Sequence, residues 1–271
     1  MPGLPPIIAV ANELPHRIAE RVLRERDAHE DDHIAANLQK WWSRFPHVFT
    51  NPSMLSLHRF YQEQLGDVRG KTVLEYGCGK GDFAAWLSTL GAYVVGIDIS
   101  EFNIARCNTR FGGKELDSKS YRFYVMDAHL LQFADSSFDV VLGNGIIHHL
   151  DLPTAMKEVD RVLKPGGVAL FQEPLGDNPL LKFYRHLARY HTEDERPLSR
   201  RELAYLENEW HVLTKFSGLF TMPVAILTSF LLRPFPNNWL LRLASAAEEI
   251  ANRRRLLRHW NRMAVFLYQK P

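Results

Sequence analysis

Cysteine is nearly absent from this chain of 271 residues, which contains only Cys78 and Cys107. Two cysteines cannot form a disulfide framework, and no CxxC pair of the kind that holds a structural metal ion is present. Because disulfide-poor chains are typical of reducing compartments, we expect a cytoplasmic protein, and we predict no metal site.

Basic residues are missing from the start of the chain. The apolar run Pro6–Ala11 has no Lys or Arg before it, since the first basic residue is Arg17. The positive region of a secretion signal is therefore lacking. One other uncharged run, 216–232, has 17 residues, the lower edge of the length that crosses a bilayer. It contains Pro223 and lies between two predicted strands of one sheet, so we expect no transmembrane helix.

Net charge is also small, because 33 basic and 31 acidic residues leave only +2. This balance excludes an acidic disordered chain and a nucleic-acid binder that relies on overall basicity. It is nevertheless a cancellation: residues 1–180 hold 18 basic and 23 acidic groups, whereas residues 181–271 hold 15 and 8. A local basic surface in the C-terminal part stays open.

What the chain does have is an alternation of short apolar runs with helical patterns. The runs are Thr72–Tyr76, Tyr93–Ile97, Tyr121–Val125, Phe138–Leu142 and Val168–Gln172, and three of them are followed directly by Gly or Asp. Several are apolar on both faces, which indicates a parallel sheet covered by helices on both sides. The predicted class is α/β, doubly wound and Rossmann-like, with ligands at the carboxyl ends of the strands.

Ahead of this sheet, residues 1–66 have a different texture. A charged arm is followed by apolar side chains at helical spacing over 34–66, and Pro52 suits a first helical turn. We predict two helices here. The domain prediction is an N-terminal arm and helices covering the cleft (1–66), then one domain over 67–271.

A glycine-rich turn, Gly77-Cys-Gly79-Lys-Gly81, follows the first predicted strand and opens a helix. Glycines there permit positive φ and a close ligand approach, and the N–H groups of the helix start point toward the ligand. Asp82 stands where a dinucleotide fingerprint needs its third glycine, and the Gly-Lys-Ser/Thr of a P-loop is missing. A pyrophosphate or triphosphate ligand is therefore disfavoured.

Two acidic residues end the next two strands. Asp98, about 20 residues after the glycine turn, is placed to accept hydrogen bonds from both hydroxyls of a ribose. Asp127 is placed to receive an adenine amino group. The alternative for either is a helix N-cap.

Five segments in this order resemble a class I S-adenosylmethionine-dependent methyltransferase: Val73–Gly81, Val95–Ser100, Met126–Ala128, Phe138–Val141 with Ile146–Leu150, and Arg161–Gly167. The chain is most similar to the small-molecule branch that contains the ubiquinone and menaquinone methyltransferases. The resemblance covers about residues 70–174. It implies an S-adenosyl-L-methionine cofactor with S-adenosyl-L-homocysteine as product.

The resemblance also implies site residues. Methionine would bind at Glu75, Gly77 and Gly79, and ribose at Asp98. Adenine would lie near Ile99, Asp127 and Ala128, and the backbone of Asn144 and Gly145 would hold the methionine amino end. The family's sheet ends with a sixth strand and an antiparallel seventh, for which Trp210–Phe216 and Met263–Tyr268 are the candidates. The chain departs from the family in the 46 residues, 217–262, that separate these two strands.

Candidate bases follow two strands. His148 and His149 come after the fourth strand, where an imidazole suits proton removal near pH 7, and Glu173 ends the fifth. The alternatives are that the histidines only pack and bond the loop, and that Glu173 pairs with an arginine such as Arg185. Tyr184, His186 and His191 line the acceptor site or have surface roles. A metal site drawn from His186, His191 and Glu193 is rejected, because its spacing is not diagnostic.

The insertion 217–262 has three interpretations. Its second half, Trp239–Trp260, is amphipathic: Leu240, Leu243, Ala247, Ile250 and Ala251 share one face, opposite Arg242, Glu248, Glu249 and Arg253. The helices pad the domain or form a homodimer contact, close as a lid over a hydrophobic acceptor, or dock on anionic lipid.

The sequence thus predicts a methyltransferase acting on an oxygen or carbon atom of a small, hydrophobic acceptor, such as an isoprenoid, polyketide, quinone precursor or lipid. Two alternatives are a methyltransferase for protein or RNA and a non-catalytic S-adenosylmethionine-binding protein. Against a nucleic-acid partner, the basic residues of the insertion lack interleaved aromatics.

Overall fold

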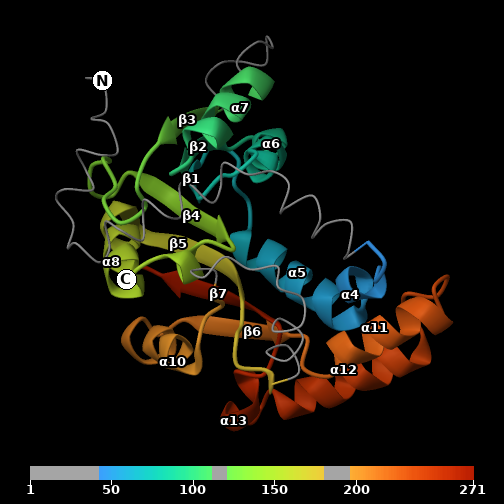
Figure 1. Ribbon diagram of the computed structural model, residues 1–271. Helices are drawn as coiled ribbons and strands as arrows, with labels where there is room; N and C mark the ends of the chain where they lie inside the picture. The colour runs from blue at the N-terminus through green and yellow to red at the C-terminus, as the bar shows by residue number, and fades with distance from the viewer. Residues whose placement is uncertain (1–42, 112–120, 180–195) are drawn as a thin grey trace. The chain divides into compact units, whose positions relative to one another are not determined.

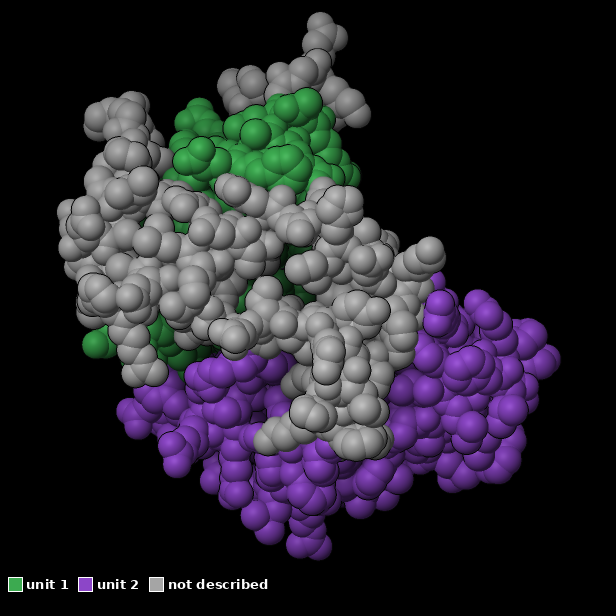
Figure 2. Space-filling model, viewed as in Figure 1, with its two compact units in different colours: residues 1–31, 65–171, 267–271 green, residues 32–64, 172–266 purple. Residues whose placement is uncertain are grey.

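The computed structural model describes residues 43–111, 121–179 and 196–271 (Figure 1). Among these, residues 65–171 and 267–271 form a first compact unit, and residues 43–64 and 172–266 form a second (Figure 2). The predicted N-terminal arm and the first of the two predicted helices lie outside the described residues. The same holds for Tyr184, Arg185, His186, His191 and Glu193.

The described residues form a seven-stranded sheet with the order β3-β2-β1-β4-β5-β7-β6. Its strands are β1 (Thr72–Tyr76), β2 (Tyr93–Asp98), β3 (Tyr121–Val125), β4 (Phe138–Asn144), β5 (Leu163–Pro174), β6 (Leu213–Ser217) and β7 (Met263–Gln269). All seven predicted strands are therefore present. β5 begins earlier than expected, at Leu163 and not Val168, because the Lys164–Gly167 segment is part of the strand.

Pairing in the sheet is parallel where ligands are expected. β1 is parallel to both β2 and β4, with Val73 opposite Val94 and Val140, and β2 is parallel to β3. β7 runs against β5, since Gly166 donates to Lys270 O at one end and Leu175 donates to Arg262 O at the other. The order of the strands reverses between β1 and β4, the place where doubly wound sheets bind ligands.

The core of the first unit follows from strands that are apolar on both faces. Val73, Leu74, Val140 and Val141 have no exposed surface. The flanking elements are α6 (Asp82–Thr89), α7 (Glu101–Phe111), the 3₁₀ turn η1 (Ile147–His149) and α8 (Leu152–Val162). Asp151 begins α8, because its carboxylate accepts the Thr154 N–H at 3.2 Å.

The second unit is mostly helical. It contains α4 (His47–Thr50), most of α5 (Pro52–Leu65), α10 (Arg200–Glu209), α11 (Thr221–Leu231), α12 (Trp239–Ala251) and α13 (Arg255–Arg258). α5 confirms the predicted helix near Pro52, and Ser199 and Glu202 form a capping box at α10, a helix the sequence patterns did not suggest. α11 packs against α4 and α12 around Phe45, Val48, Ala225 and Leu241.

α12 corrects the expectation for the insertion. The helix ends at Ala251, and its buried residues are Leu241, Ala244 and Glu248. Leu243 and Ile250, expected on an apolar face, are 61% and 65% exposed, whereas Glu248, expected on the polar face, is 1% exposed. The helix is thus turned with a carboxylate inward.

Hydrogen bonds explain this orientation. One Glu248 oxygen accepts from Ser53 Oγ and Gly218 N, and the other accepts from Phe220 N, Thr221 N and Thr221 Oγ1 at 2.9–3.0 Å. Hydrogen bonds from this many donors offset the free-energy cost of removing the carboxylate from water. It also satisfies N–H groups at the start of α11, which have no partner within that helix.

Glu248→Ala should therefore lower the free energy of unfolding by about 3 kcal/mol, because buried N–H groups lose their acceptor. Chemical denaturation followed by far-UV circular dichroism measures the change. Glu249→Ala is the matched control, since Glu249 is the exposed neighbour on the same helix, and it should change stability little. Equal effects of the two substitutions would contradict the assigned role.

Candidate functional site

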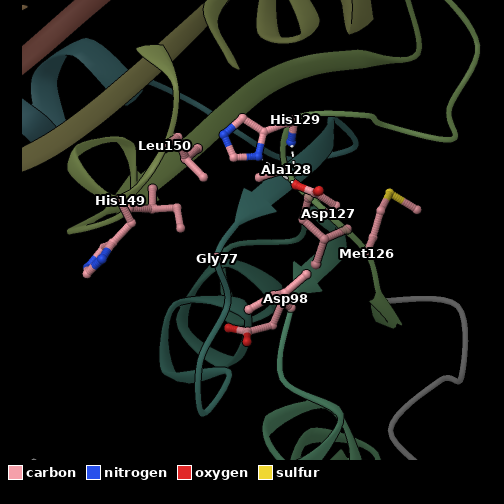
Figure 3. A pocket seen from close by; sticks show the side chains of 11 residues that line it. Gly77, Asp98, Met126, Asp127, Ala128, His129, His149 and Leu150 are labelled. Atoms are coloured by element: carbon pink, nitrogen blue, oxygen red, sulfur yellow. Dashed lines mark hydrogen bonds and ion pairs between the residues drawn. The ribbon is translucent and has the colours of Figure 1, made fainter. Parts of the chain in front are cut away.

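A pocket lies at the carboxyl ends of β1 to β4 in the first unit (Figure 3). The residues that line it lie at or after the ends of these four strands. They are Gly77, Ile97, Asp98, Ile99, Met126, Asp127, Ala128, His129, Ile146, His149 and Leu150. Most of these side chains are apolar, with two carboxylates among them. Such a lining suits a flat apolar group with a few polar atoms.

The glycine turn has the backbone that the sequence predicts. Gly77 has φ +76°, and a Cβ there would lie 2.8 Å from two atoms of the Ile146 side chain. Gly79 has φ +48°, and a Cβ there would meet nothing within 4 Å. Gly77 is thus required by packing as well as by conformation, while open space lies beside Gly79.

Asp98 ties the glycine turn to β2. Its Oδ2 accepts the Gly79 N–H at 2.8 Å, and its Oδ1 accepts the Ser100 N–H at 2.9 Å and Asn103 Nδ2 at 3.4 Å. The Ser100 hydroxyl accepts the Asn103 N–H in the first turn of α7, so Ser100 has the N-cap role considered for Asp98. A carboxylate has about four acceptor positions, which leaves one on Oδ2.

Asp127 belongs to a buried chain of hydrogen bonds. Its Oδ1 accepts both the backbone N–H and ring Nδ1 of His129, each at 2.8 Å, and the Asp151 N–H donates to His129 Nε2 at 2.8 Å. Because Nε2 accepts, the proton of a neutral His129 ring lies on Nδ1. No helix begins at Asp127, so the N-cap alternative is wrong.

The second oxygen of Asp127 is different. Asp127 is 3% exposed, and its Oδ2 has no hydrogen-bond partner among the described residues. The hydroxyl of buried Tyr76 donates to the Ala128 carbonyl and fixes the adjoining backbone. Burial, with help from the nearby Asp127 charge, raises the pKa of Tyr76 above its usual value, so this donor keeps its proton. A buried acceptor without a donor is costly unless a ligand supplies one.

Glu75 contains a second such oxygen. Glu75 is 6% exposed and lies near the start of α6. Its Oε2 has no hydrogen-bond partner among the described residues. Burial raises the pKa of Glu75 to about 8, although the hydrogen bond from the Ala84 N–H acts to lower it. The side chain does not line the pocket.

The remaining predicted residues divide between two places. His149 lines the pocket, and its ring centroid lies 4.0 Å from that of His148, which is buried but outside the lining. Asn144 and Gly145, at the end of β4, are also outside the lining, as is Gly79. Glu173 is fully buried near the end of β5 and belongs to the second unit.

Sequence reasoning missed His129, which fixes the orientation of Asp127. A signal was available, because a histidine two residues after a strand-end Asp can bond that carboxylate locally. The apolar lining residues Ile97, Ile146 and Leu150 belong to the family-like segments, but they are not among the site residues predicted from the sequence.

Strand order, the antiparallel β7 and a glycine turn that leads to acidic residues after β2 and β3 together define the class I methyltransferase fold. Residues 74–171 match the family model described as a methyltransferase domain. The resemblance to class I S-adenosylmethionine-dependent methyltransferases, of the quinone methyltransferase type, is thereby confirmed.

Curated relatives are similar over part of the chain. A demethylmenaquinone methyltransferase of Lactococcus lactis is 32% identical over 56% of this chain and 61% of its own length. A sterol 24-C-methyltransferase of Aspergillus fumigatus is 37% identical over 42% of this chain and 31% of its own. The chain thus spans less than two thirds of these relatives. Among solved structures, geranyl diphosphate C-methyltransferase from Streptomyces coelicolor has a TM-score of 0.55 at 16% identity and covers 79% of this chain and 78% of its own, which shows the shared fold.

The raised pKa of Glu75 predicts a pH dependence of stability. Between the ordinary pKa of 4.5 and the folded-state pKa of about 8, the unfolded chain releases a proton that the folded chain keeps. The free energy of unfolding should therefore fall as pH rises through this range. Glu75→Gln, which cannot ionise, should remove a few kcal/mol of that fall.

Urea unfolding at a series of pH values measures this difference, with Glu63→Gln as the control because Glu63 is exposed on α5. The control should retain the wild-type pH slope. If Glu75→Gln has the same slope as wild type, Glu75 is already ionised in the folded protein.

Proposed function

We propose that this protein is an S-adenosylmethionine-dependent methyltransferase that transfers a methyl group to an oxygen or carbon atom of a small, hydrophobic acceptor. The observation that carries this proposal is the second carboxylate oxygen of Asp127. It is buried, lacks a donor among the described residues, and belongs to a carboxylate that His129 holds in one orientation.

The residues present fit S-adenosyl-L-methionine. An adenine amino group is a donor that would satisfy Asp127 Oδ2, and the apolar lining suits the faces of the ring. Asp98 keeps one acceptor position for a ribose hydroxyl. Its carboxylate also disfavours a 2′-phosphate. The space beside Gly79 and the second oxygen of Glu75 would receive the methionine end, whose ammonium group is a donor.

The bound sulfonium would supply an activated methyl group. The tasks left to the chain are to orient both partners and to exclude water. A base is needed only where the acceptor must lose a proton. Of the candidate bases, His149 lines the pocket, and we propose it for that role ahead of its neighbour His148. Glu173 is a candidate base from its position in the sequence alone, because it does not line the pocket.

The acceptor class is supported by the relatives, whose names are those of quinone and sterol methyltransferases. Residues 1–66 are proposed to cover the cleft and residues 217–262 to form the helical insertion of one domain, 67–271. We also propose peripheral membrane contact through 217–262, because a water-insoluble acceptor is held in lipid. The alternative is that the same surface forms a homodimer contact. Cytoplasmic location agrees with the two reduced cysteines.

Labelled methyl transfer tests the function. The purified protein is incubated with methyl-labelled donor and a metabolite extract, which is then separated into organic and aqueous phases for mass spectrometry. Label in organic-phase metabolites is the expected result. Label only in water-soluble metabolites would overturn the acceptor class, label in protein or RNA would support the macromolecular alternative, and donor binding without turnover would show a non-catalytic protein.

A base-swapped ligand tests the role of Asp127. The wild type should bind S-adenosylhomocysteine at least about tenfold more tightly than its inosine analogue, which presents a carbonyl oxygen in place of the amino donor. Asp127→Asn keeps an acceptor for His129 and places an amide NH₂ at the free position. This variant should lose the preference for adenine.

Isothermal titration calorimetry of both ligands measures the preference. Asp135→Asn is the control, because the Asp135 side chain is 77% exposed and lies outside the pocket lining, and it should bind as the wild type does. An Asp127→Asn variant that still prefers adenine to the same degree would remove Asp127 from the adenine site.

A further inference from the structure

The hairpin of α11 and α12 in the second unit has its apolar side chains on the outside. We define its outer face by residues that are 52–68% exposed: Leu227, Phe230, Leu231, Phe235, Trp239, Leu243 and Ile250. Their spacing of three, four and seven residues within each helix places them on one side of it. Exposed apolar residues gathered in this way mark an interaction surface.

The inner side of the same hairpin contains polar side chains as well as the apolar Ala225 and Leu241. Thr221, Thr228, Ser229, Asn238 and Glu248 are each at most 8% exposed. His47 Nδ1 lies 2.9 Å from Thr228 Oγ1, and the His47 N–H donates to Ser229 Oγ at 3.2 Å. Together with the five hydrogen bonds to Glu248, these contacts fix which side of the helices faces inward. The outward direction of the apolar side chains is therefore set by the fold.

Most of the exposed charges on the hairpin are positive. From residue 217 to the end of α12 at Ala251, the exposed ionised side chains are Arg233, Arg242 and Glu249, and the other acidic residue, Glu248, is buried. Arg233 lies in the link between the helices, two residues before Phe235. Apolar side chains bordered by arginines complement a bilayer with anionic headgroups.

The depth of contact is limited by helix length. None of the described helices is long and apolar enough to cross a membrane. α11 and α12 have 11 and 13 residues, which suits helices that lie in the boundary between headgroups and acyl chains. A tryptophan at the start of α12 is also typical of that boundary.

We propose that the outer face of the α11–α12 hairpin docks on the surface of an anionic phospholipid membrane, with Arg233 and Arg242 against the headgroups. This inference extends the proposed function, because docking would bring the protein to a water-insoluble acceptor. Docking itself requires neither the methyl donor nor the acceptor, so it is tested separately from methyl transfer.

The test is binding of the full chain to vesicles without donor or acceptor. Co-sedimentation with phosphatidylcholine vesicles is compared with co-sedimentation with vesicles that also contain phosphatidylserine, at low and high salt. The expected result is binding to the anionic vesicles that weakens as salt rises, because screening reduces the arginine contribution. Equal binding to both kinds of vesicle would overturn the anionic preference.

Two variants separate the apolar and charged contributions. Leu231→Ser with Leu243→Ser should lower the partition coefficient at least about tenfold. Arg233→Gln with Arg242→Gln should lower it roughly fivefold for each arginine on anionic vesicles only. The matched control is Leu90→Ser with Leu213→Ser, two leucines that are 40% and 55% exposed outside the hairpin, and it should bind as the wild type does.

Sedimentation velocity of each variant in solution completes the design. Concentration-dependent dimerisation that Leu231→Ser with Leu243→Ser abolishes, without vesicle binding by the wild type, would assign the face to self-association and overturn the proposal. A monomer that does not bind vesicles would overturn it as well. Far-UV circular dichroism establishes that each variant is folded, since all four leucines are exposed.

Discussion

Buried carboxylates must be paired with hydrogen-bond donors, and this constraint governs both units of the protein. Glu248 meets it completely, with five donors from the chain around it. Asp127 meets it for one oxygen only, and Glu75 keeps one oxygen without a partner among the described residues. The same chemical group thus holds the fold together at one place and stays ready for a ligand at another.

Half-satisfied carboxylates are stable in the fold only where their orientation is imposed. His129 supplies two donors to the same oxygen of Asp127 and is itself held by the Asp151 N–H, at the start of α8. The hydrogen bonds among Asp127, His129 and Asp151 thus offset the free-energy cost of the unpaired oxygen. A site prepared in this way loses little further freedom when a donor binds, which is the benefit of preorganisation.

The sheet and the glycine turn were predictable because their signals are local: a strand period, a positive-φ glycine and an acidic residue at the next strand end. The local bond of His129 to Asp127 had a signal in the sequence, but its second bond did not, because the partner Asp151 is 22 residues away. The orientation of α12 could not be predicted from the sequence for a related reason. Periodicity identifies two faces of a helix, but contacts distant in sequence decide which one is buried.

α12 shows how those distant contacts prevail over hydrophobicity. Burying Leu243 and Ile250 would favour the opposite orientation by a few kcal/mol in total. It would also expose Glu248 and leave the N–H groups of Gly218, Phe220 and Thr221 without their acceptor, a larger cost when these groups are buried. Polar satisfaction therefore acts together with the burial of Leu241 and Ala244, and Leu243 and Ile250 are left on the surface. The exposed apolar side chains of the outer face are still in contact with water in the folded protein. Free energy is therefore gained when this face moves into an environment less polar than water.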